Sequence, residues 1–187
     1  GGDLALDSSH PLGIEPPPSL LDAKASRVTT FARSIEVDAP QAWLFELMQD
    51  YERRLAWDEF LEKAELVGGA TASAVGVRAY CVDTSGRGME TEYVAFKPPE
   101  RVAVKMTRGP WMFRSFAGSW AYRSLGEERT EITFRYSMEL FPRVLGKLGD
   151  RLLARVFARD MERRLTSAKS RLERLYREAR EASRHPC

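Results

Sequence analysis

Apolar and polar residues alternate along much of the chain before residue 141, and this alternation predicts β-strands. The cleanest run is residues 130–140, where apolar residues from Ile132 to Leu140 take every second position. Turns that contain Gly or Pro separate the runs. The predicted strands lie at residues 28–38, 60–67, 75–83, 88–97, 101–107, 110–122 and 130–140.

A helical period replaces the alternation directly after the first strand. Trp43, Leu47 and Met48 recur at helical spacing. Asp38 precedes them at a position that suits an N-cap, and Pro40 suits a first helical turn. We therefore expect a short helix that Asp38 caps.

The pattern after Pro142 is helical nearly to the end of the chain. One stripe of a helix running from about Asp150 to Ser183 is apolar, and arginines lie largely opposite it. Gly146 and Gly149 come before this stripe, so we expect a break near Gly149. The stripe consists of Leu153, Phe157, Met161, Leu165, Ala168, Leu172 and Leu175.

This order of elements predicts a single α+β domain at residues 27–183. One strand, short helices, six antiparallel strands and a long terminal helix form a two-layer design. In it, a curved antiparallel sheet of about seven strands wraps around the C-terminal helix. Residues 1–26 contain the run IEPPPS, which favours an extended chain, so we expect a flexible N-terminal extension without an intact secretory signal.

Composition indicates the environment of the protein. Hydrophobic residues make up 43% of the chain, and no run approaches the roughly 18 apolar residues of a membrane span. Cys81 lies in an apolar run and Cys187 is the last residue, which gives no disulfide framework. We therefore expect a cytoplasmic protein in which Cys81 is a buried, inert thiol.

Three segments carry a family resemblance: DYERRLAWDEFLEKAELV, FAGSWAYRSLGEERTEITFRYSMEL and VFARDMERRLTSAKSRLE. Together with the Trp57–Asp58 pair, Gly76 at the start of a strand and Trp120 before the last hairpin, they make residues 28–176 resemble the START-like, or SRPBCC, superfamily. Within it, the polyketide cyclase/dehydrase and coenzyme Q-binding groups are the most similar. The resemblance implies a helix-grip fold with a cavity between the sheet and the terminal helix. It fixes no activity, because the superfamily includes cyclases, carriers, receptors and co-chaperones.

The aromatic stretch PWMFRSFAGSWAY is the candidate wall of that cavity. Phe116, Gly118, Trp120 and Tyr122 share one strand face, and Gly118 leaves a gap between large rings that suits a flat apolar ligand. The alternative is that the rings fill the core and leave no cavity. The predicted ligand-binding residues are Trp57, Tyr80, Phe116, Trp120, Tyr136, Met138, Phe157 and Met161.

The sequence lacks the common catalytic motifs. Its two histidines, His10 and His185, lie near the ends of the chain, so we expect no histidine-based nucleophile, no metal site and no cofactor. A tyrosine or a carboxyl group in a dry pocket can serve acid–base chemistry of the cyclase type, and the candidates are Tyr136, Tyr93 and Glu92. For a charged candidate such as Glu92, the alternative is an outward-facing position on a strand.

Asp58, next to Trp57, has two interpretations. Its carboxylate contacts a ligand polar group or an arginine, or it only ties the turn before the next strand through Asx-type hydrogen bonds. We favour the turn role.

Charge is distributed unevenly along the chain. Residues 143–187 contain 13 Lys/Arg and 6 Asp/Glu, a net charge of +7, whereas the rest carries a net charge of −5. Nucleic acid is not an expected partner, because no recognition motif is present and the acidic body would repel phosphate. Arginines beside Leu172, Leu175 and Tyr176 predict weak contact of the last helical turns with anionic membranes, or a homodimer through the same helix. A solvated helix face is the alternative.

Three functions remain open at this point. The first is binding or transport of a small apolar ligand, flat or lipid-like. The second is a cyclase- or dehydratase-type enzyme, and the third is a protein-interaction module without a ligand.

Overall fold

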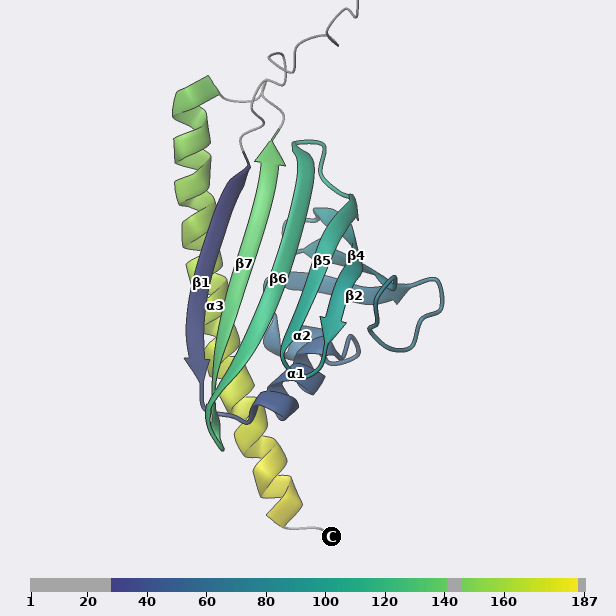
Figure 1. Cartoon of the computed structure of the whole chain (residues 1–187), viewed down its shortest axis with the longest axis vertical. Helices are drawn as coiled ribbons and strands as arrows, with labels where there is room; N and C mark the ends of the chain where they lie inside the picture. The colour runs from purple at the N-terminus through teal and green to yellow at the C-terminus, as the bar shows by residue number, and fades with distance from the viewer. Residues whose placement is uncertain (1–27, 141–145, 185–187) are drawn as a thin grey trace, which may run out of the picture.

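The computed structural model describes residues 28–140 and 146–184, and the side chains of 28–140 and 155–184. Seven antiparallel strands form one curved sheet around a long terminal helix (Figure 1). The predicted helix-grip fold is therefore confirmed. The strands are β1 (Thr29–Val37), β2 (Leu61–Val67), β3 (Arg78–Asp83), β4 (Gly88–Lys97), β5 (Arg101–Arg108), β6 (Phe113–Gly126) and β7 (Arg129–Leu140); the helices are α1 (Gln41–Gln49), α2 (Arg54–Trp57) and α3 (Gly146–Arg184). Their order in the sheet is β1-β7-β6-β5-β4-β3-β2.

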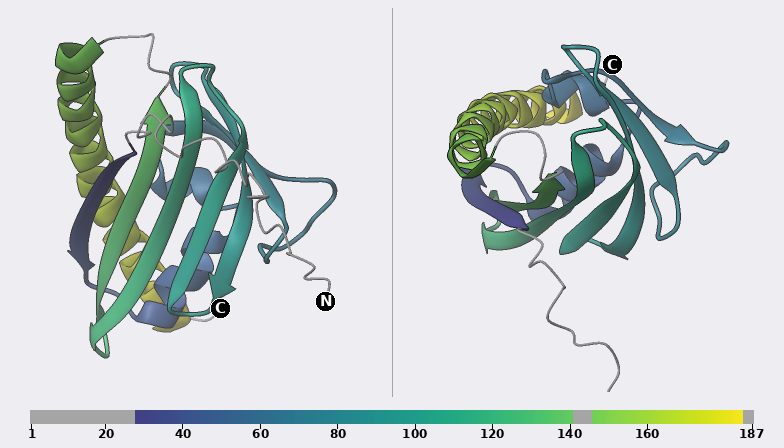
Figure 2. Two further views of the ribbon diagram at one scale, coloured as in Figure 1. Left: turned by 45° about the horizontal axis from the view of Figure 1, so that its top comes forward. Right: turned by 90° about the horizontal axis from the view of Figure 1, so that it is seen from above.

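The helices lie on the concave side of the sheet. α1 and α2 sit near its lower end in Figure 1, whereas α3 runs along nearly the whole molecule. Seen from above, the sheet bends round and α3 lies along its open side (Figure 2). α3 contacts β1 at one edge of the sheet and α2 beside the other edge. The concave space is therefore closed from below by α1 and α2.

β7 illustrates why these residues form this sheet. Ile132, Phe134 and Tyr136 are buried on one face, as the alternation predicts. β7 pairs on both sides, so that Phe31 of β1 lies opposite Tyr136 and Trp120 of β6 lies opposite Phe134. A strand that is paired on both sides and buried on one face has a strongly specified register. This register decides which rings of β6 and β7 face α3.

The packed core lies at the lower end, between the sheet, α1 and the second half of α3. Leu44 and Met48 of α1, Ile132 of β7 and Leu172 of α3 are fully enclosed. Burying a side chain of this kind contributes about 1.5–3 kcal/mol relative to leaving it exposed. The apolar stripe predicted for the short helix and the part of the long helix's stripe from Leu165 to Leu172 therefore face the core.

Two local predictions about the helices are wrong. Pro40, not Asp38, is the N-cap of α1: its backbone is extended, and its carbonyl accepts the N–H of Leu44 at 3.0 Å. The backbone N–H of Asp38 donates to Glu173 Oε1 at 3.2 Å instead. α3 also continues through Gly149 without a break. A glycine inside a helix costs only about 1 kcal/mol, which propagation of a 39-residue helix offsets.

Candidate ligand-binding site

A cavity of about 290 Å³ lies in the upper half of the molecule, between the concave face of the sheet and the part of α3 from Val156 to Arg164. Its volume is close to that of the smaller ligand pockets, which span about 300–1,000 Å³. Arg87 and Val156 line the cavity and are largely exposed, so it opens to solvent on their side. The aromatic rings of β6 and β7 therefore do not fill this half of the fold.

Rings from β6 and β7 form the sheet side of the cavity. Phe116 and Tyr136 have ring centres 5.5 Å apart, and Trp120 Nε1 donates a hydrogen bond to Tyr136 Oη at 3.1 Å. Gly118 lies opposite Tyr136, and a Cβ atom on Gly118 would come within 3.1 Å of the Tyr136 ring. The gap predicted at Gly118 is thus occupied by this ring, which can approach β6 closely because Gly118 has no side chain.

Six of the eight residues predicted to bind a ligand line this cavity. Four of them come from β6 and β7, and two come from α3, where they lie one helical turn apart. These strands and this helix face each other across the cavity. Contact with a ligand itself stays a prediction. The six are Phe116, Trp120, Tyr136, Met138, Phe157 and Met161.

Trp57 lies behind the inner end of the cavity rather than in its wall. It is 2% exposed, and the guanidinium carbon of Arg54 lies 4.2 Å from its ring centre. The same carbon lies 4.5 Å from the ring of Trp120, so Arg54 is held between two indoles. Trp57 Nε1 and Arg54 Nε are buried without a hydrogen-bond partner in the described part of the chain. Trp57 is therefore a core residue, contrary to the expectation from the sequence.

Tyr80 and Glu92 project from the outer face of the sheet. Ala79 is fully buried and Cys81 lines the cavity, so Tyr80 between them points away from it. Glu92 Oε1 lies 3.4 Å from Lys105 Nζ in a partly exposed ion pair. Neither side chain reaches the cavity, which corrects Tyr80 as a ligand contact and Glu92 as a general acid.

Three charged side chains meet at the inner end of the cavity. Asp58 is 1% exposed and accepts hydrogen bonds from Arg54 Nη2 at 3.1 Å and from Arg164 Nε at 3.0 Å, with a second contact from Arg164 Nη2. Arg54 Nη1 also donates to the carbonyl of Met48 at 3.3 Å. The predicted turn role of Asp58 is wrong, because its carboxylate is occupied by the two arginines. We call Arg54, Asp58 and Arg164 the charged cluster.

The charged cluster shifts the pKa values of its own members. Burial alone raises the pKa of Asp58, but the charges of Arg164 and Arg54 and their hydrogen bonds hold it below the ordinary value. Burial has the largest single influence and lowers the pKa of each arginine, but the Asp58 charge together with smaller contributions from neighbouring groups raises both pKa values above the ordinary value. All three groups are therefore ionised at neutral pH.

A network of neutral polar groups adjoins the charged cluster. Tyr93 Oη donates to Gln49 Oε1 at 2.9 Å and lies 3.3 Å from Tyr51 Oη, while Gln49 Nε2 donates to Tyr122 Oη at 3.2 Å. Burial raises the pKa of Tyr51 and of Tyr122 well above the ordinary value, so both stay protonated. Tyr93 lines the cavity, but its proton is already donated to Gln49.

Several cavity residues were not predicted from the sequence. Arg164 stands seven residues after Phe157 and three after Met161, which places it on the apolar stripe of α3; a charged residue at such a position is the signal that identifies it in the sequence. Cys81 was expected to be inert; it lines the cavity, and burial raises the pKa of its thiol, which disfavours the reactive thiolate. The residues that were missed include Tyr51, Arg54, Met89, Asp160 and Arg164.

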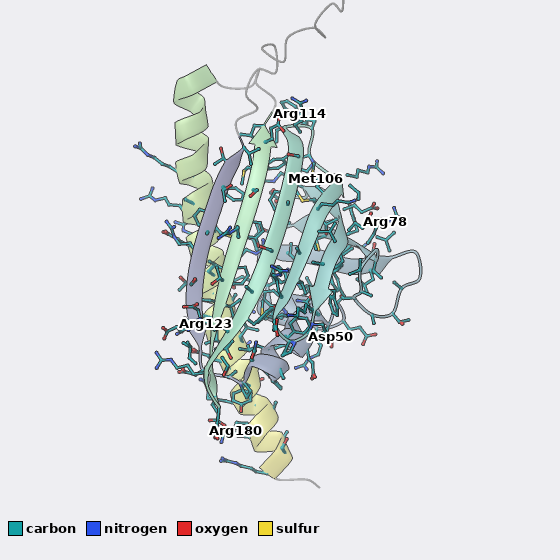
Figure 3. All side chains as sticks on the ribbon, viewed as in Figure 1. Asp50, Arg78, Met106, Arg114, Arg123 and Arg180 are labelled. Carbon is teal, nitrogen blue, oxygen red and sulfur yellow. The ribbon has the colours of Figure 1, made fainter. Side chains whose placement is uncertain are left out.

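The mouth of the cavity lies at the upper end of the sheet. Phe113 lines it at the start of β6, and Trp111 in the preceding loop is 73% exposed. In Figure 3, Arg114 lies at the upper end of the sheet, whereas Asp50 lies lower, beside α1 and α2. A ligand would therefore enter past the β5–β6 loop and reach the charged cluster last.

The basic end of α3 is largely tied to the body of the protein. Leu172 is fully buried, and Tyr176 packs against Trp43 with ring centres 5.0 Å apart, so these side chains face inward. At the C-terminal end, the last turns of α3 extend beyond the sheet in Figure 1. Within the described residues, no helix is long and apolar enough to cross a membrane. Three of the arginines form ion pairs, Arg171 with Glu59, Arg174 with Glu178 and Arg180 with Glu128.

Comparison with known proteins supports this description of the fold. The model of a family described as polyketide cyclase / dehydrase and lipid transport matches residues 28–173. A START superfamily protein from Mycobacterium smegmatis has a TM-score of 0.61 at 13% identity, covering 80% of this chain and 98% of its own. Ginseng major latex-like protein 151 from Panax ginseng has a TM-score of 0.59 at 15% identity, covering 80% and 97%. No curated protein matches the sequence.

Proposed function

Because the chain belongs to the polyketide cyclase/dehydrase and lipid transport family, we propose that its cavity binds a small flat apolar ligand and, through that binding, carries it. The observation that carries this proposal is the cavity between the sheet and α3, whose wall is built from the rings of Phe116, Trp120, Tyr136 and Phe157. Pockets for small molecules are mostly apolar, with a few polar groups that fix the orientation of the ligand. The charged cluster supplies such groups at the inner end.

Binding is favoured over cyclase or dehydratase chemistry by the positions of the acid–base candidates. Glu92 lies on the outer face, and the proton of Tyr93 is donated to Gln49. Tyr136 lines the cavity, and its hydroxyl accepts a hydrogen bond from Trp120. Catalysis would therefore depend on Tyr136 as the proton donor among the three candidates.

We place the protein in the cytoplasm, in keeping with the free thiol of Cys81.

Extraction of purified protein with organic solvent, followed by mass spectrometry, tests this function directly. We expect an apolar molecule to co-purify in a stoichiometric amount. Titration of the emptied protein with flat apolar compounds should change the tryptophan emission, because Trp120 lines the cavity.

Two matched variants tie the signal to the cavity. Val104→Phe places a ring in the cavity wall, whereas Val94→Phe adds the same ring at a position that is 45% exposed on the neighbouring strand. We expect Val104→Phe to abolish both co-purification and quenching, and Val94→Phe to preserve them. An apolar ligand that binds both variants equally well would show that binding occurs elsewhere, and the proposed function would be wrong.

A further inference from the structure

The charged cluster carries one more positive charge than negative charge. Arg54 is 4% exposed and the Asp58 side chain is fully buried, while the Arg164 side chain is 18% exposed and lines the cavity. A buried charge without a counter-charge is costly, so the inner end of the cavity favours an anion. A ligand in this largely apolar cavity would therefore contact the excess positive charge only at the inner end.

The hydrogen bonds of the cluster show which donor is left. Asp58 accepts from Arg54 Nη2, Arg164 Nε and Arg164 Nη2, which occupies its carboxylate. Arg164 Nη1 has no partner within the described residues. Unlike Arg54 Nε, it is not among the fully buried atoms that lack a partner, so it reaches open space. Both arginines line the cavity, but the unpaired Nε of Arg54 is buried, so the accessible free donor of the cluster is Arg164 Nη1.

The remaining acidic groups of the cavity lie nearer its mouth. Asp83 accepts hydrogen bonds from Arg87 Nε at 2.8 Å, from the backbone N–H of Arg87 at 3.0 Å and from the hydroxyl of Ser85. Asp160 lies one turn of α3 before Arg164, towards the mouth, and forms no ion pair within the described residues. Asp160 would repel an anion at mid-cavity, which leaves the inner end as the place where an anionic group is favoured.

We propose that the natural ligand is an aromatic or polycyclic carboxylic acid, and that its carboxylate enters first and is bound by Arg164 Nη1. This inference rests on the proposed function, because it concerns the same cavity. A single excess charge suits a monoanion, whereas a phosphate dianion would leave the site with a net negative charge. Two contacts fix the orientation of Arg164. It pairs with Asp58 through two nitrogen atoms, and the guanidinium carbon of Arg164 lies 5.2 Å from the ring centre of Phe60. A guanidinium fixed in this way needs little reordering when it binds a carboxylate.

A pair of probes with nearly the same shape tests the inference on the wild-type protein. 2-Naphthylacetate and 2-naphthylacetamide share the ring and the side-chain length, and they differ in charge at neutral pH. Isothermal titration calorimetry and tryptophan quenching give both dissociation constants. We expect the acid to bind at least about tenfold more tightly than the amide, which corresponds to about 1.4 kcal/mol.

Two charge-matched variants locate the preference. Arg164→Gln removes the proposed carboxylate donor, and Arg123→Gln removes an equal charge from a surface pair with Glu131. We expect Arg164→Gln to bind the two probes with about equal affinity, and Arg123→Gln to keep the wild-type ratio. Thermal unfolding of each variant reports whether it is folded. The wild-type comparison decides the question even where Arg164→Gln is unstable.

The possible outcomes separate this inference from the proposed function. If acid and amide bind wild type equally well, or if Arg164→Gln keeps the preference while folded, the carboxylate inference is wrong and the apolar cavity stands. If neither probe binds and no apolar molecule can be extracted, both are wrong. A preference for the acid that Arg164→Gln abolishes and Arg123→Gln preserves supports the inference.

Discussion

The lower and upper halves of the concave space are built from the same strands and the same helix, yet one is packed and the other is hollow. In the lower half, Phe45 of α1 packs against Tyr122 and Phe96 with ring centres 5.3 and 5.5 Å apart. In the upper half, Phe116 of β6 and Tyr136 of β7 face a cavity of about 290 Å³. The density of aromatic residues is therefore not what decides whether a core is filled.

The difference between the halves comes from the short helices. α1 contributes Leu44 and Met48 to the lower half, and α2 ends at Trp57, below the cavity. Above that level, the sheet, α3 and loop residues such as Phe60 and Met112 surround the space, and no short helix fills it within the described residues. The charged cluster lies at the boundary, so the hollow half ends on charged groups rather than on apolar packing. Substitutions at this boundary should therefore lower the stability of the packed half and weaken ligand binding in the hollow half. Substitutions at the mouth or on the outer face should change neither.

The largest effect is expected from Trp120→Ala, because Trp120 belongs to both halves. It packs against Trp57 and Phe134 and lines the cavity. Truncating a large buried aromatic side chain typically costs about 3–5 kcal/mol. Urea unfolding should show a loss of this size, together with weaker probe binding. Trp111→Ala is the matched control, and it should leave stability within about 0.5 kcal/mol because Trp111 is 73% exposed. Equal stability of wild type and Trp120→Ala would show that the boundary is not part of the core.

The second-largest loss of stability is expected from Asp58→Asn, which leaves two buried arginines without their counter-charge. Removing one partner of a buried ion pair costs about 3–5 kcal/mol. We expect the lower end of this range, because the asparagine carbonyl still accepts a hydrogen bond from one arginine. Glu131→Gln, in a surface pair with Arg123, should change the free energy of unfolding by less than about 1 kcal/mol.

The pH dependence of stability distinguishes the charge of Asp58 from its packing. The pKa of Asp58 is lowered in the folded state, so its ionisation stabilises the fold above the unfolded pKa of about 3.9. This contribution is lost as the pH falls through the lowered folded value. The difference in unfolding free energy between wild type and Asp58→Asn should therefore be largest near pH 7 and shrink below about pH 4. A difference that stays constant down to pH 2 would assign the effect to packing.

The comparison of the two halves also explains what the sequence could predict. Alternation places Phe134 and Tyr136 on one face, and helical spacing places Met161 and Leu172 on another, so the fold follows from local patterns. The position of Trp57 does not, because it depends on Arg54 lying between two indoles that are far apart in the sequence. Hydrophobic patterns identify a buried face, but they do not show how far a filling helix extends over it.

Charged residues in the core are the part that sequence reasoning missed most clearly. Arg54 and Asp58 are four residues apart, and Arg164 is 106 residues away from Asp58. The local pair could have been noticed as an i, i+4 ion pair, but its partner on α3 becomes apparent only when the fold brings α2 and α3 together. Charge compensation between residues far apart in the sequence depends on tertiary structure. The sequence therefore contains only a weak sign of it, which is the position of Arg164 on the apolar stripe of α3.

A smaller effect is expected from Tyr136→Phe, which keeps the ring and removes the hydroxyl. Trp120 Nε1 then loses its acceptor, at a cost of about 0.5–1.5 kcal/mol. Tyr80→Phe on the outer face is the matched control and should leave stability unchanged. Probe affinity measured in parallel shows whether the hydroxyl also serves a ligand. Unchanged affinity for both the acid and the amide would restrict its role to Trp120.

The smallest effect is expected at the basic end of α3, which marks the limit of the packed half. Arg177 and Arg184 form no ion pair within the described residues, and each cation near an anionic surface adds about 1 kcal/mol. Cosedimentation with anionic vesicles should therefore be weak, absent with neutral vesicles, and lost at high salt. We expect the double variant Arg177→Gln/Arg184→Gln to lose this binding and Arg123→Gln to keep it. Substitution is preferable to truncation here, because a chain ending before Leu172 would lose a fully buried core residue. Binding that survives high salt or the double variant, or that never appears on anionic vesicles, would leave these arginines as a solvated helix end.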